Sequence, residues 1–184
     1  MIKKTILLST AILGVAAIGL NAFADDKAAT KTKPEKKITS AVDLFPETLY
    51  NAEGEEVSRD QLKGKIVGIY FSAHWCPPCR AFTPSLVKFR NQNKDDFEIV
   101  FVSSDKNEAA QMQYMKDTKM KWTTVKFGTK KVKALKDRYK VRGIPKLIIV
   151  GPDGKTITDD GRGDVSKKAA TAIDAWKAKA GKTA

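Results

Sequence analysis

The sequence has very little cysteine and histidine, with two cysteines and one histidine in 184 residues. A structural zinc site takes four ligands, usually of these two types, and the chain does not supply them. The same count excludes a framework of several disulfides. No separate cysteine lies in a Pro-x-x-x-Thr-x-x-Cys segment, which disfavours a peroxidase. We therefore expect no bound metal and no cofactor.

Acidic residues are also scarce, because 21 Asp and Glu face 34 Lys and Arg and give a formal net charge of +13. Such a balance favours encounters with anionic surfaces such as membranes, polysaccharide or nucleic acid. The lysines are spread along the chain, however, and no nucleic-acid-binding motif accompanies them. We interpret the charge as a solvated surface and expect no nucleic-acid partner.

Long hydrophobic runs are absent except for one at the N-terminus. Lys3 and Lys4 precede the uncharged, mainly apolar residues 5–20, and Ala22-Phe23-Ala24 follows them. This order is typical of a secretory signal peptide. The run is shorter than the ~20 residues that cross a bilayer comfortably, so retention as an anchor is the weaker alternative. We expect cleavage after Ala24, a periplasmic or secreted protein, and no integral membrane segment in the mature chain.

The remaining chain is predicted to form a tether and one domain. Residues 25–39 are rich in Lys, Ala and Thr with almost no large apolar side chain, which is typical of a flexible segment. Residues 40–184 show no internal repeat and are long enough for a single domain with a core of its own.

The domain alternates between apolar runs and helical patterns. Short continuous apolar runs predict buried strands, and the turn signal at residues 151–154 predicts a hairpin after the third of them. The predicted strands are 66–71, 98–103, 146–150 and 156–158, and the predicted helices are 79–89, 107–118, 130–139 and 164–179. This alternation indicates an α/β sheet with helices on both faces.

Apolar side chains in the helical segments recur at spacings of three and four. In the first helix these are Cys79, Phe82, Leu86 and Phe89, and in the last they are Val165, Ala169, Ile173 and Trp176. Each set is predicted to lie on one helix face against the core. We assign Trp122 to packing as well.

The two cysteines, Cys76 and Cys79, lie where a strand pattern gives way to a helical one. In this context, Cys-x-x-Cys spacing is typical of a redox motif. A thiolate at a helix N-terminus faces free backbone N–H groups and the positive end of the helix dipole, which lower its pKa. Cys76 is therefore predicted to be the exposed nucleophile, and Cys79 the more buried resolving thiol. A purely structural Cys76–Cys79 disulfide is the alternative, but closing so short a loop stabilises little.

The residues between the cysteines bear on the direction of electron flow. Pro77 and Pro78 have no N–H group to donate to the Cys76 sulfur. With fewer donors the thiolate is stabilised less, and a strongly oxidising centre is one whose reduced form is stabilised. The pair of prolines therefore favours a reductant.

The segment 71–80, FSAHWCPPCR, resembles the tryparedoxin/nucleoredoxin branch of the thioredoxin superfamily. The likeness covers roughly residues 64–165. It continues in Phe82-Thr83-Pro84, Val102-Ser103-Ser104-Asp105, Tyr139-Lys140-Val141-Arg142-Gly143-Ile144-Pro145, Asp153-Gly154 and Gly161-Arg162. The lead-in Leu62-Lys63-Gly64-Lys65 is also similar to exported bacterial TlpA-like thioredoxins, which reduce selected disulfides outside the cytosol.

The resemblance implies a thioredoxin fold, an α/β architecture with a central mixed β-sheet and helices on both faces. It also implies a cis peptide bond between Ile144 and Pro145 beside the cysteines, and a kink in the first helix at Pro84. Substrate-binding residues are expected beside and between the cysteines and in the segment that carries the cis-proline. They are Trp75, Pro77, Pro78, Gly143, Ile144 and Pro145.

Four further residues are of interest near the motif. Tyr70 stands where classical thioredoxins bury an acid, which leaves no evident carboxylate base for Cys79. Lys146 follows the cis-proline, where relatives often have Thr, and is expected to add positive charge near the thiolate. Arg80 and His74 are candidate electrostatic modulators, although a solvated helix position for Arg80 and a surface position at a strand end for His74 explain them equally well or better.

The sequence thus predicts an exported enzyme that reduces protein disulfides through Cys76 and Cys79. Its partners would be a disulfide-containing protein and a thiol electron donor, and we expect a monomer. Two alternatives stay open. One is a disulfide oxidase or isomerase, and the other is a binding protein without redox activity that holds partners through its basic surface.

Overall fold

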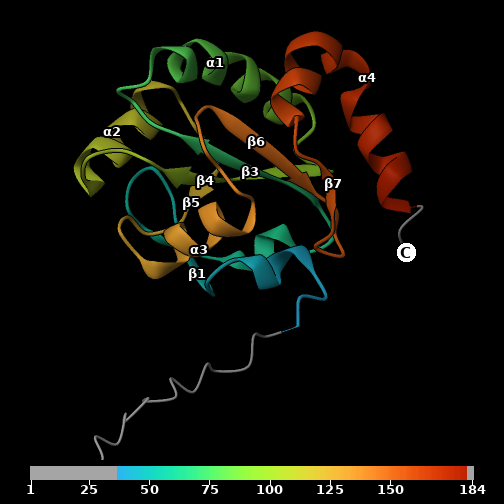
Figure 1. Cartoon of the computed structure of the whole chain (residues 1–184), viewed down its shortest axis with the longest axis horizontal. Helices are drawn as coiled ribbons and strands as arrows, with labels where there is room; N and C mark the ends of the chain where they lie inside the picture. The colour runs from blue at the N-terminus through green and yellow to red at the C-terminus, as the bar shows by residue number, and fades with distance from the viewer. Residues whose placement is uncertain (1–36, 182–184) are drawn as a thin grey trace, which may run out of the picture. The chain divides into compact units, whose positions relative to one another are not determined.

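A seven-stranded mixed sheet organises the chain. The computed structural model describes residues 37–181, which Figure 1 draws in colour. The sheet order is β2-β1-β5-β4-β3-β6-β7. The strands are β1 (Thr48–Tyr50), β2 (Glu56–Ser58), β3 (Ile66–Ser72), β4 (Phe97–Ser103), β5 (Thr123–Thr124), β6 (Lys146–Val150) and β7 (Thr156–Thr158).

Parallel and antiparallel pairs both occur in this sheet. Strand β3 runs parallel to β4, with Ile66 opposite Phe97, and antiparallel to β6, with Tyr70 opposite Leu147. β6 and β7 form the predicted hairpin. The described residues 37–181 thus form the mixed sheet that was predicted, and β3, which carries the cysteine motif at its end, lies near the middle of it.

Helices cover both faces of the sheet (Figure 1). The four α-helices are α1 (Pro77–Gln92), α2 (Glu108–Asp117), α3 (Lys130–Arg138) and α4 (Gly161–Gly181), and two short 3-10 helices are η1 (Ala41–Leu44) and η2 (Arg59–Leu62). Buried side chains of α1, α2 and α4 share one core cluster, whereas those of α3, η1 and η2 belong to a second.

Strand β3 shows why the buried strands are continuously apolar. Ile66 and Tyr70 enter the cluster shared with α1, whereas Val67, Ile69 and Phe71 enter the cluster shared with α3. Alternate side chains of a strand point to opposite faces, so a strand covered on both faces needs apolar residues at every position.

The predicted packing of the helices is correct with one exception. Trp122 and Trp176 are buried, as expected. Ala169, which was predicted to face the core, is exposed. Lys168 has φ −139° and ψ 28°, which are not helical values, and this interruption changes the register of α4. Beyond it, Ala172 takes a buried position beside the other core residues of the helix.

The N-terminal end of the described chain is tied to the fold. Ile38 packs against the core cluster of α3, and the backbone N–H of Thr39 donates to the Asp43 carboxylate at 3.1 Å. The folded part therefore includes Ile38, two residues before the predicted boundary at Ser40. The predicted signal peptide, residues 1–24, and most of the predicted tether lie outside the described residues.

Candidate active site

The two cysteines form a disulfide at the start of α1. Cys76 is the N-cap residue of the helix, in an extended conformation with φ −92° and ψ 107°, and Cys79 lies in the first turn. Their Cα atoms are 5.2 Å apart. Strand β3 ends four residues before Cys76. The disulfide therefore lies beyond the C-terminal end of this inner strand, where the chain passes into α1.

Both cysteines are buried, although the sequence predicted this only for Cys79. Cys79 is fully buried, as predicted, but Cys76 retains only 3% of its accessible surface. The prediction that Cys76 is exposed was therefore wrong, because its side chain is almost fully buried in the disulfide form. The disulfide packs together with Ala73, and the half-buried side chain of Ile144 covers it from the neighbouring loop.

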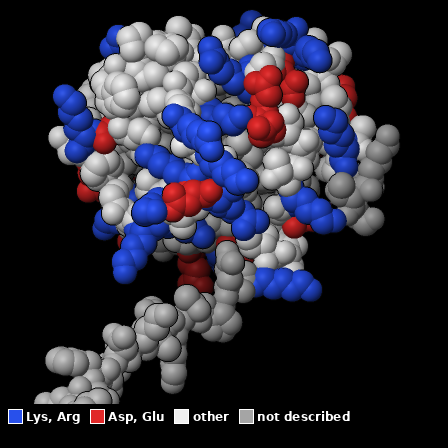
Figure 2. Space-filling view, in the orientation of Figure 1, with Lys and Arg blue, Asp and Glu red and all other residues white. Residues whose placement is uncertain are grey.

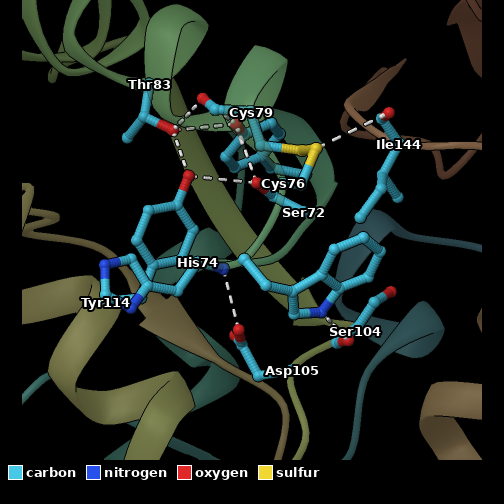
Figure 3. Close-up of a disulfide and its surroundings, with 11 residues drawn as sticks. Ser72, His74, Cys76, Cys79, Thr83, Ser104, Asp105, Tyr114 and Ile144 are labelled. Atoms are coloured by element: carbon cyan, nitrogen blue, oxygen red, sulfur yellow. Dashed lines mark hydrogen bonds between the residues drawn. A yellow bond between two sulfur atoms is a disulfide. The ribbon is translucent and has the colours of Figure 1, made fainter.

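The loop before β6 faces the disulfide. The peptide bond between Ile144 and Pro145 is cis, as the resemblance implied. The carbonyl oxygen of Ile144 lies 3.8 Å from Cys76 Sγ (Figure 3). A disulfide sulfur has no hydrogen, so this is a contact in the oxidised protein, and the same geometry lets a reduced Cys76 thiol donate to the carbonyl. Gly143, next to Ile144, is exposed.

Trp75 is the exposed aromatic residue of the site. It is 56% exposed and directly precedes Cys76. Its indole Nε1 donates to the carbonyl oxygen of Ser104 at 2.9 Å, which anchors the ring to the segment after β4. A fixed aromatic surface beside the disulfide suits contact with a substrate chain.

His74 is turned away from the disulfide. Its imidazole stacks on the Tyr114 ring, with centroids 5.4 Å apart (Figure 3). Its Nε2 lies 3.9 Å from the Asp117 carboxylate. Its backbone N–H donates to Asp105 Oδ1 at 2.7 Å. The histidine therefore acts on the site through its backbone, and the structure does not bring its side chain to the cysteines.

A buried group of hydroxyls lies beneath Cys79. Its members are Tyr70, Ser72, Thr83 and Tyr114. Thr83 Oγ1 donates to the Cys79 carbonyl at 2.9 Å, and it lies 2.9 Å from Tyr70 Oη and 2.7 Å from Tyr114 Oη. Burial raises the pKa of Tyr70 well above its ordinary value, so the phenol stays protonated over a wider pH range than a free tyrosine does. Hydroxyls thus occupy the region where an acidic side chain is buried in classical thioredoxins.

The first turn of α1 offers no free backbone donor to the Cys76 sulfur. Pro77 and Pro78 have no N–H. The amides of Cys79 and Arg80 both donate to the Cys76 carbonyl oxygen at 3.1 Å. Each N–H of this turn is therefore either missing or already engaged.

The two predicted cationic modulators behave differently. The Arg80 side chain is exposed, and its guanidinium makes no hydrogen bond or ion pair with any residue between 37 and 181. Lys146 Nζ lies 3.3 Å from the Asp159 carboxylate, so its charge is shared with an acid. The charge that Lys146 was expected to add near the thiolate is thus partly neutralised.

Between residues 37 and 181, no three His, Cys, Asp or Glu side chains are grouped so as to hold a metal ion. Over this stretch, no helix combines the length and the apolar character that crossing a bilayer demands.

The chemistry that this arrangement supports follows from the cysteine pair. Two thiols that close into a disulfide release two electrons, and reopening the disulfide takes two up. The surrounding loop and Trp75 give a partner chain a surface next to the sulfurs. The fold and the site thus define a dithiol oxidoreductase.

Comparisons with known proteins give the family. The family model described as thioredoxin-like matches residues 64–156. The structure of a thioredoxin from Wuchereria bancrofti is 45% identical with a TM-score of 0.64, and the match covers 73% of this chain and 96% of that one. Tryparedoxin II from C. fasciculata is 34% identical with a TM-score of 0.65, over 71% of this chain and 89% of that one. The chain belongs to the thioredoxin-like family, which confirms the predicted thioredoxin fold.

Nucleoredoxins are similar in sequence. Probable nucleoredoxin 1 of Arabidopsis thaliana is 42% identical over 113 residues, which are 60% of this chain and 19% of that protein. Mouse nucleoredoxin is 40% identical over 121 residues, 64% of this chain and 27% of that protein. The chain therefore spans about a fifth of the plant relative and just over a quarter of the mouse one. The predicted resemblance to the tryparedoxin/nucleoredoxin branch is confirmed.

Sequence reasoning missed several residues that shape the site. Asp105 and Ser104 hold the backbone of His74 and the ring of Trp75, and Tyr114 completes the hydroxyl group. The segment Val102-Ser103-Ser104-Asp105 belonged to the family resemblance, and that was a signal that it matters. Its role depends on β4 lying beside β3, which the segment itself does not reveal.

Proposed function

We propose that this protein reduces disulfides of other proteins outside the cytosol. The observation that carries the proposal is the first turn of α1, where Pro77 and Pro78 lack N–H groups and the next two amides bind the Cys76 carbonyl. A Cys76 thiolate receives little stabilisation there, so the dithiol form is less favoured than in a strongly oxidising centre. The pair then tends to give its electrons to a substrate.

The proposed reaction has two exchange steps. The Cys76 thiolate attacks one sulfur of the substrate disulfide, forms a mixed disulfide, and releases the other substrate sulfur as a thiolate. Cys79 then loses its proton and attacks Cys76 Sγ, which releases the second substrate thiol and closes the Cys76–Cys79 disulfide. The substrate gains two electrons and two protons, and a thiol donor must later return both to the enzyme.

The site offers a defined place for the substrate. The backbone of Ile144 faces Cys76, and in this superfamily the residue before the cis-proline pairs with the substrate chain. Because burial raises the pKa of Tyr70 and keeps its phenol protonated, this hydroxyl does not offer an ionised base to Cys79. Solvent water is the proposed acceptor of the Cys79 proton.

Insulin reduction tests the proposal. Wild type should reduce insulin with a thiol donor, Cys76→Ser should be inactive, and Cys79→Ser should accumulate a mixed disulfide through Cys76. Activity that survives Cys76→Ser would refute the nucleophile. A measured reduction potential as high as that of strongly oxidising exported enzymes would instead support the oxidase or isomerase alternative, which the position of Cys76 at a helix N-terminus favours.

Export is the second part of the proposal and depends on residues 1–24. Lys3, Lys4, the apolar run and Ala22-Phe23-Ala24 support a cleavable signal peptide. N-terminal sequencing of the protein recovered from cells should begin at Asp25. A protein that retains Met1 and stays with the cytosolic fraction would contradict export.

We propose that the protein is a monomer in solution, and light scattering tests this by measuring its mass.

A further inference from the structure

Helix α3 and its flanking segments carry a concentration of positive charge that the proposed chemistry does not use. Between residues 126 and 142 the chain has eight basic residues and one acid, Asp137. We call the eight the α3 basic face, and they are Lys126, Lys130, Lys131, Lys133, Lys136, Arg138, Lys140 and Arg142. All are exposed except Lys131 and Lys136, which are half-buried. Figure 2 shows Lys and Arg gathered over the region where Figure 1 draws α3.

The fold leaves most of this charge without a counter-charge. Within residues 37–181, a single ion pair serves the face, with Lys133 Nζ 2.6 Å from Asp137. The pKa of Lys131 is lowered by its partial burial and by the positive charges of Arg138 and Arg59. The cations therefore lie close enough together to oppose one another.

Helix stability does not explain the lysines at the start of α3. The first turn of α3 contains Lys130 and Lys131 and no acidic residue. Positive charge at a helix N-terminus opposes the helix dipole, and acidic residues are the stabilising choice there. These lysines thus work against the helix that carries them, as residues kept for binding often do.

The face is joined directly to the redox site. Arg142 lies three residues before Pro145, a span of at most about 10 Å for an extended chain. The chain just before Arg142 is held to the sheet, because the Tyr139 ring packs on Phe71 with centroids 6.4 Å apart. It leads to Ile144, whose carbonyl is 3.8 Å from Cys76 Sγ. A partner whose disulfide lies over Cys76 therefore extends readily onto this face.

We propose that the α3 basic face docks an acidic segment of the protein whose disulfide is reduced, an inference that rests on the proposed function and specifies its substrate class. A fixed, exposed aromatic residue beside a charged border is typical of protein interfaces. A lipid surface would instead favour several apolar side chains for insertion. Between residues 37 and 181, Trp75 is the one large apolar side chain that is exposed, and it lies at the disulfide. Opposite charge accelerates the encounter of such partners and fixes their orientation.

Two charge-matched variants of the full chain test this inference. The face variant is Lys126→Gln/Lys130→Gln/Lys140→Gln, and the control is Lys88→Gln/Lys94→Gln/Lys179→Gln. All six lysines are exposed, and none forms an ion pair with another described residue. The substrates are a disulfide peptide flanked by Asp residues, its twin with Asn in place of Asp, and the neutral bis(2-hydroxyethyl) disulfide.

Wild type is expected to reduce the acidic peptide about tenfold faster than its twin at low salt. This preference should shrink in the face variant to about twofold and persist in the control, while all three proteins reduce the neutral disulfide equally. High salt should abolish the preference in wild type because it screens exposed charges. Thermal melting checks the fold, and the face variant should melt no lower than wild type because Lys130 no longer opposes the dipole.

An equal rate for the two peptides in wild type overturns the inference, as does an equal loss of preference in the control. Vesicles containing phosphatidylglycerol that bind wild type but not the face variant, with no peptide preference, would assign the face to membranes instead.

If none of the disulfides is reduced, the proposed function fails. Docking is then measured with a cysteine-free acidic peptide by fluorescence anisotropy, where binding by wild type and its loss in the face variant support the inference, and no binding overturns it.

Discussion

The carboxylate of Asp105 accepts a hydrogen bond from the backbone N–H of His74 at 2.7 Å, two residues before the first cysteine. Its second oxygen accepts the Ser103 hydroxyl at 2.7 Å, and the side chain is nearly buried. The end of β4 thereby holds the turn that leads from β3 to the disulfide.

Replacement of Asp105 should loosen this turn. Asp105→Ala leaves the His74 N–H without its partner, and we expect a loss of about 1–3 kcal/mol in the free energy of unfolding and a lower kcat/KM for insulin reduction. Asp105→Asn retains an acceptor oxygen and should keep most of both. Asp95→Ala, an exposed position, serves as the control in urea unfolding and activity assays. Equal effects of Asp105→Ala and Asp95→Ala would contradict the role.

Trp75 should matter for substrate and little for stability. Because the ring is 56% exposed, Trp75→Ala is expected to change the free energy of unfolding by less than about 1 kcal/mol. Its kcat/KM should fall about tenfold for a protein disulfide, where a buried aromatic anchor contributes to binding, and far less for a small neutral disulfide. Trp75→Phe keeps a ring but not the N–H that donates to Ser104. Its kcat/KM for a protein disulfide should lie between those of wild type and Trp75→Ala. Parallel losses on both substrates would show that the ring supports the site and does not bind substrate.

Tyr70→Phe tests the buried hydroxyl group. The change removes one partner from Ser72 and from Thr83, and we expect a loss of about 1–2 kcal/mol in the free energy of unfolding. Tyr50→Phe is the matched control, because its hydroxyl makes a 3.4 Å contact with Glu56 at the surface and should contribute little. Similar losses in the two variants would argue against a network beneath Cys79.

The raised pKa of Tyr70 predicts that the free energy of unfolding depends on pH. Burial raises the pKa of Tyr70 above the ordinary value near 10, so the folded protein keeps the phenol protonated where the unfolded chain ionises it. This contribution to stability is fully present below about pH 10 and is lost as pH rises further. Urea unfolding at several pH values from 8 to 11 should therefore show a steeper decline for wild type than for Tyr70→Phe. Parallel curves would contradict the assignment.

Alanine substitutions at two glycines distinguish backbone strain from a steric clash of the added Cβ atom. Gly54 and Gly154 both have positive φ, 86° and 79°, so alanine is strained at each, by about 1 kcal/mol. An added Cβ at Gly54 meets nothing within 4 Å, whereas at Gly154 it comes within 3.0 Å of the Ser40 carbonyl oxygen and 2.7 Å of Ile38. Gly154→Ala should therefore lower the melting temperature clearly more than Gly54→Ala. Equal shifts would mean that the N-terminal segment moves aside at no cost.

The sequence pattern predicted the long strands well, because each is buried on both faces. The predicted 66–71, 98–103 and 146–150 agree with β3, β4 and β6 within one residue. β1, β2 and β5 were not predicted, since two or three residues do not establish a period, and their pairing depends on partners distant in the chain. The exposure of Ala169 was missed for a similar reason, because nothing around Lys168 marks an interruption of the helix.

The site shows the same division between local and distant information. The spacing of Cys76 and Cys79 is local, and it indicated the redox chemistry directly. The contacts of Tyr114 with Ser72 and Thr83 join residues 42 and 31 positions apart, and no local pattern reveals them. The coverage of Cys76 was misjudged because Ile144, which lies 68 positions away, provides part of it.

The two ends of the sheet order bear on how the protein behaves when it is concentrated. β2 and β7 are the edge strands, and each is three residues long. Short edge strands present few unpaired backbone groups to another chain, and a charged residue lies in β2, Glu56, and directly before β7, Lys155. We therefore expect that crowded copies do not extend one another's sheets, so the protein resists β-type aggregation while its reactive cysteines stay available.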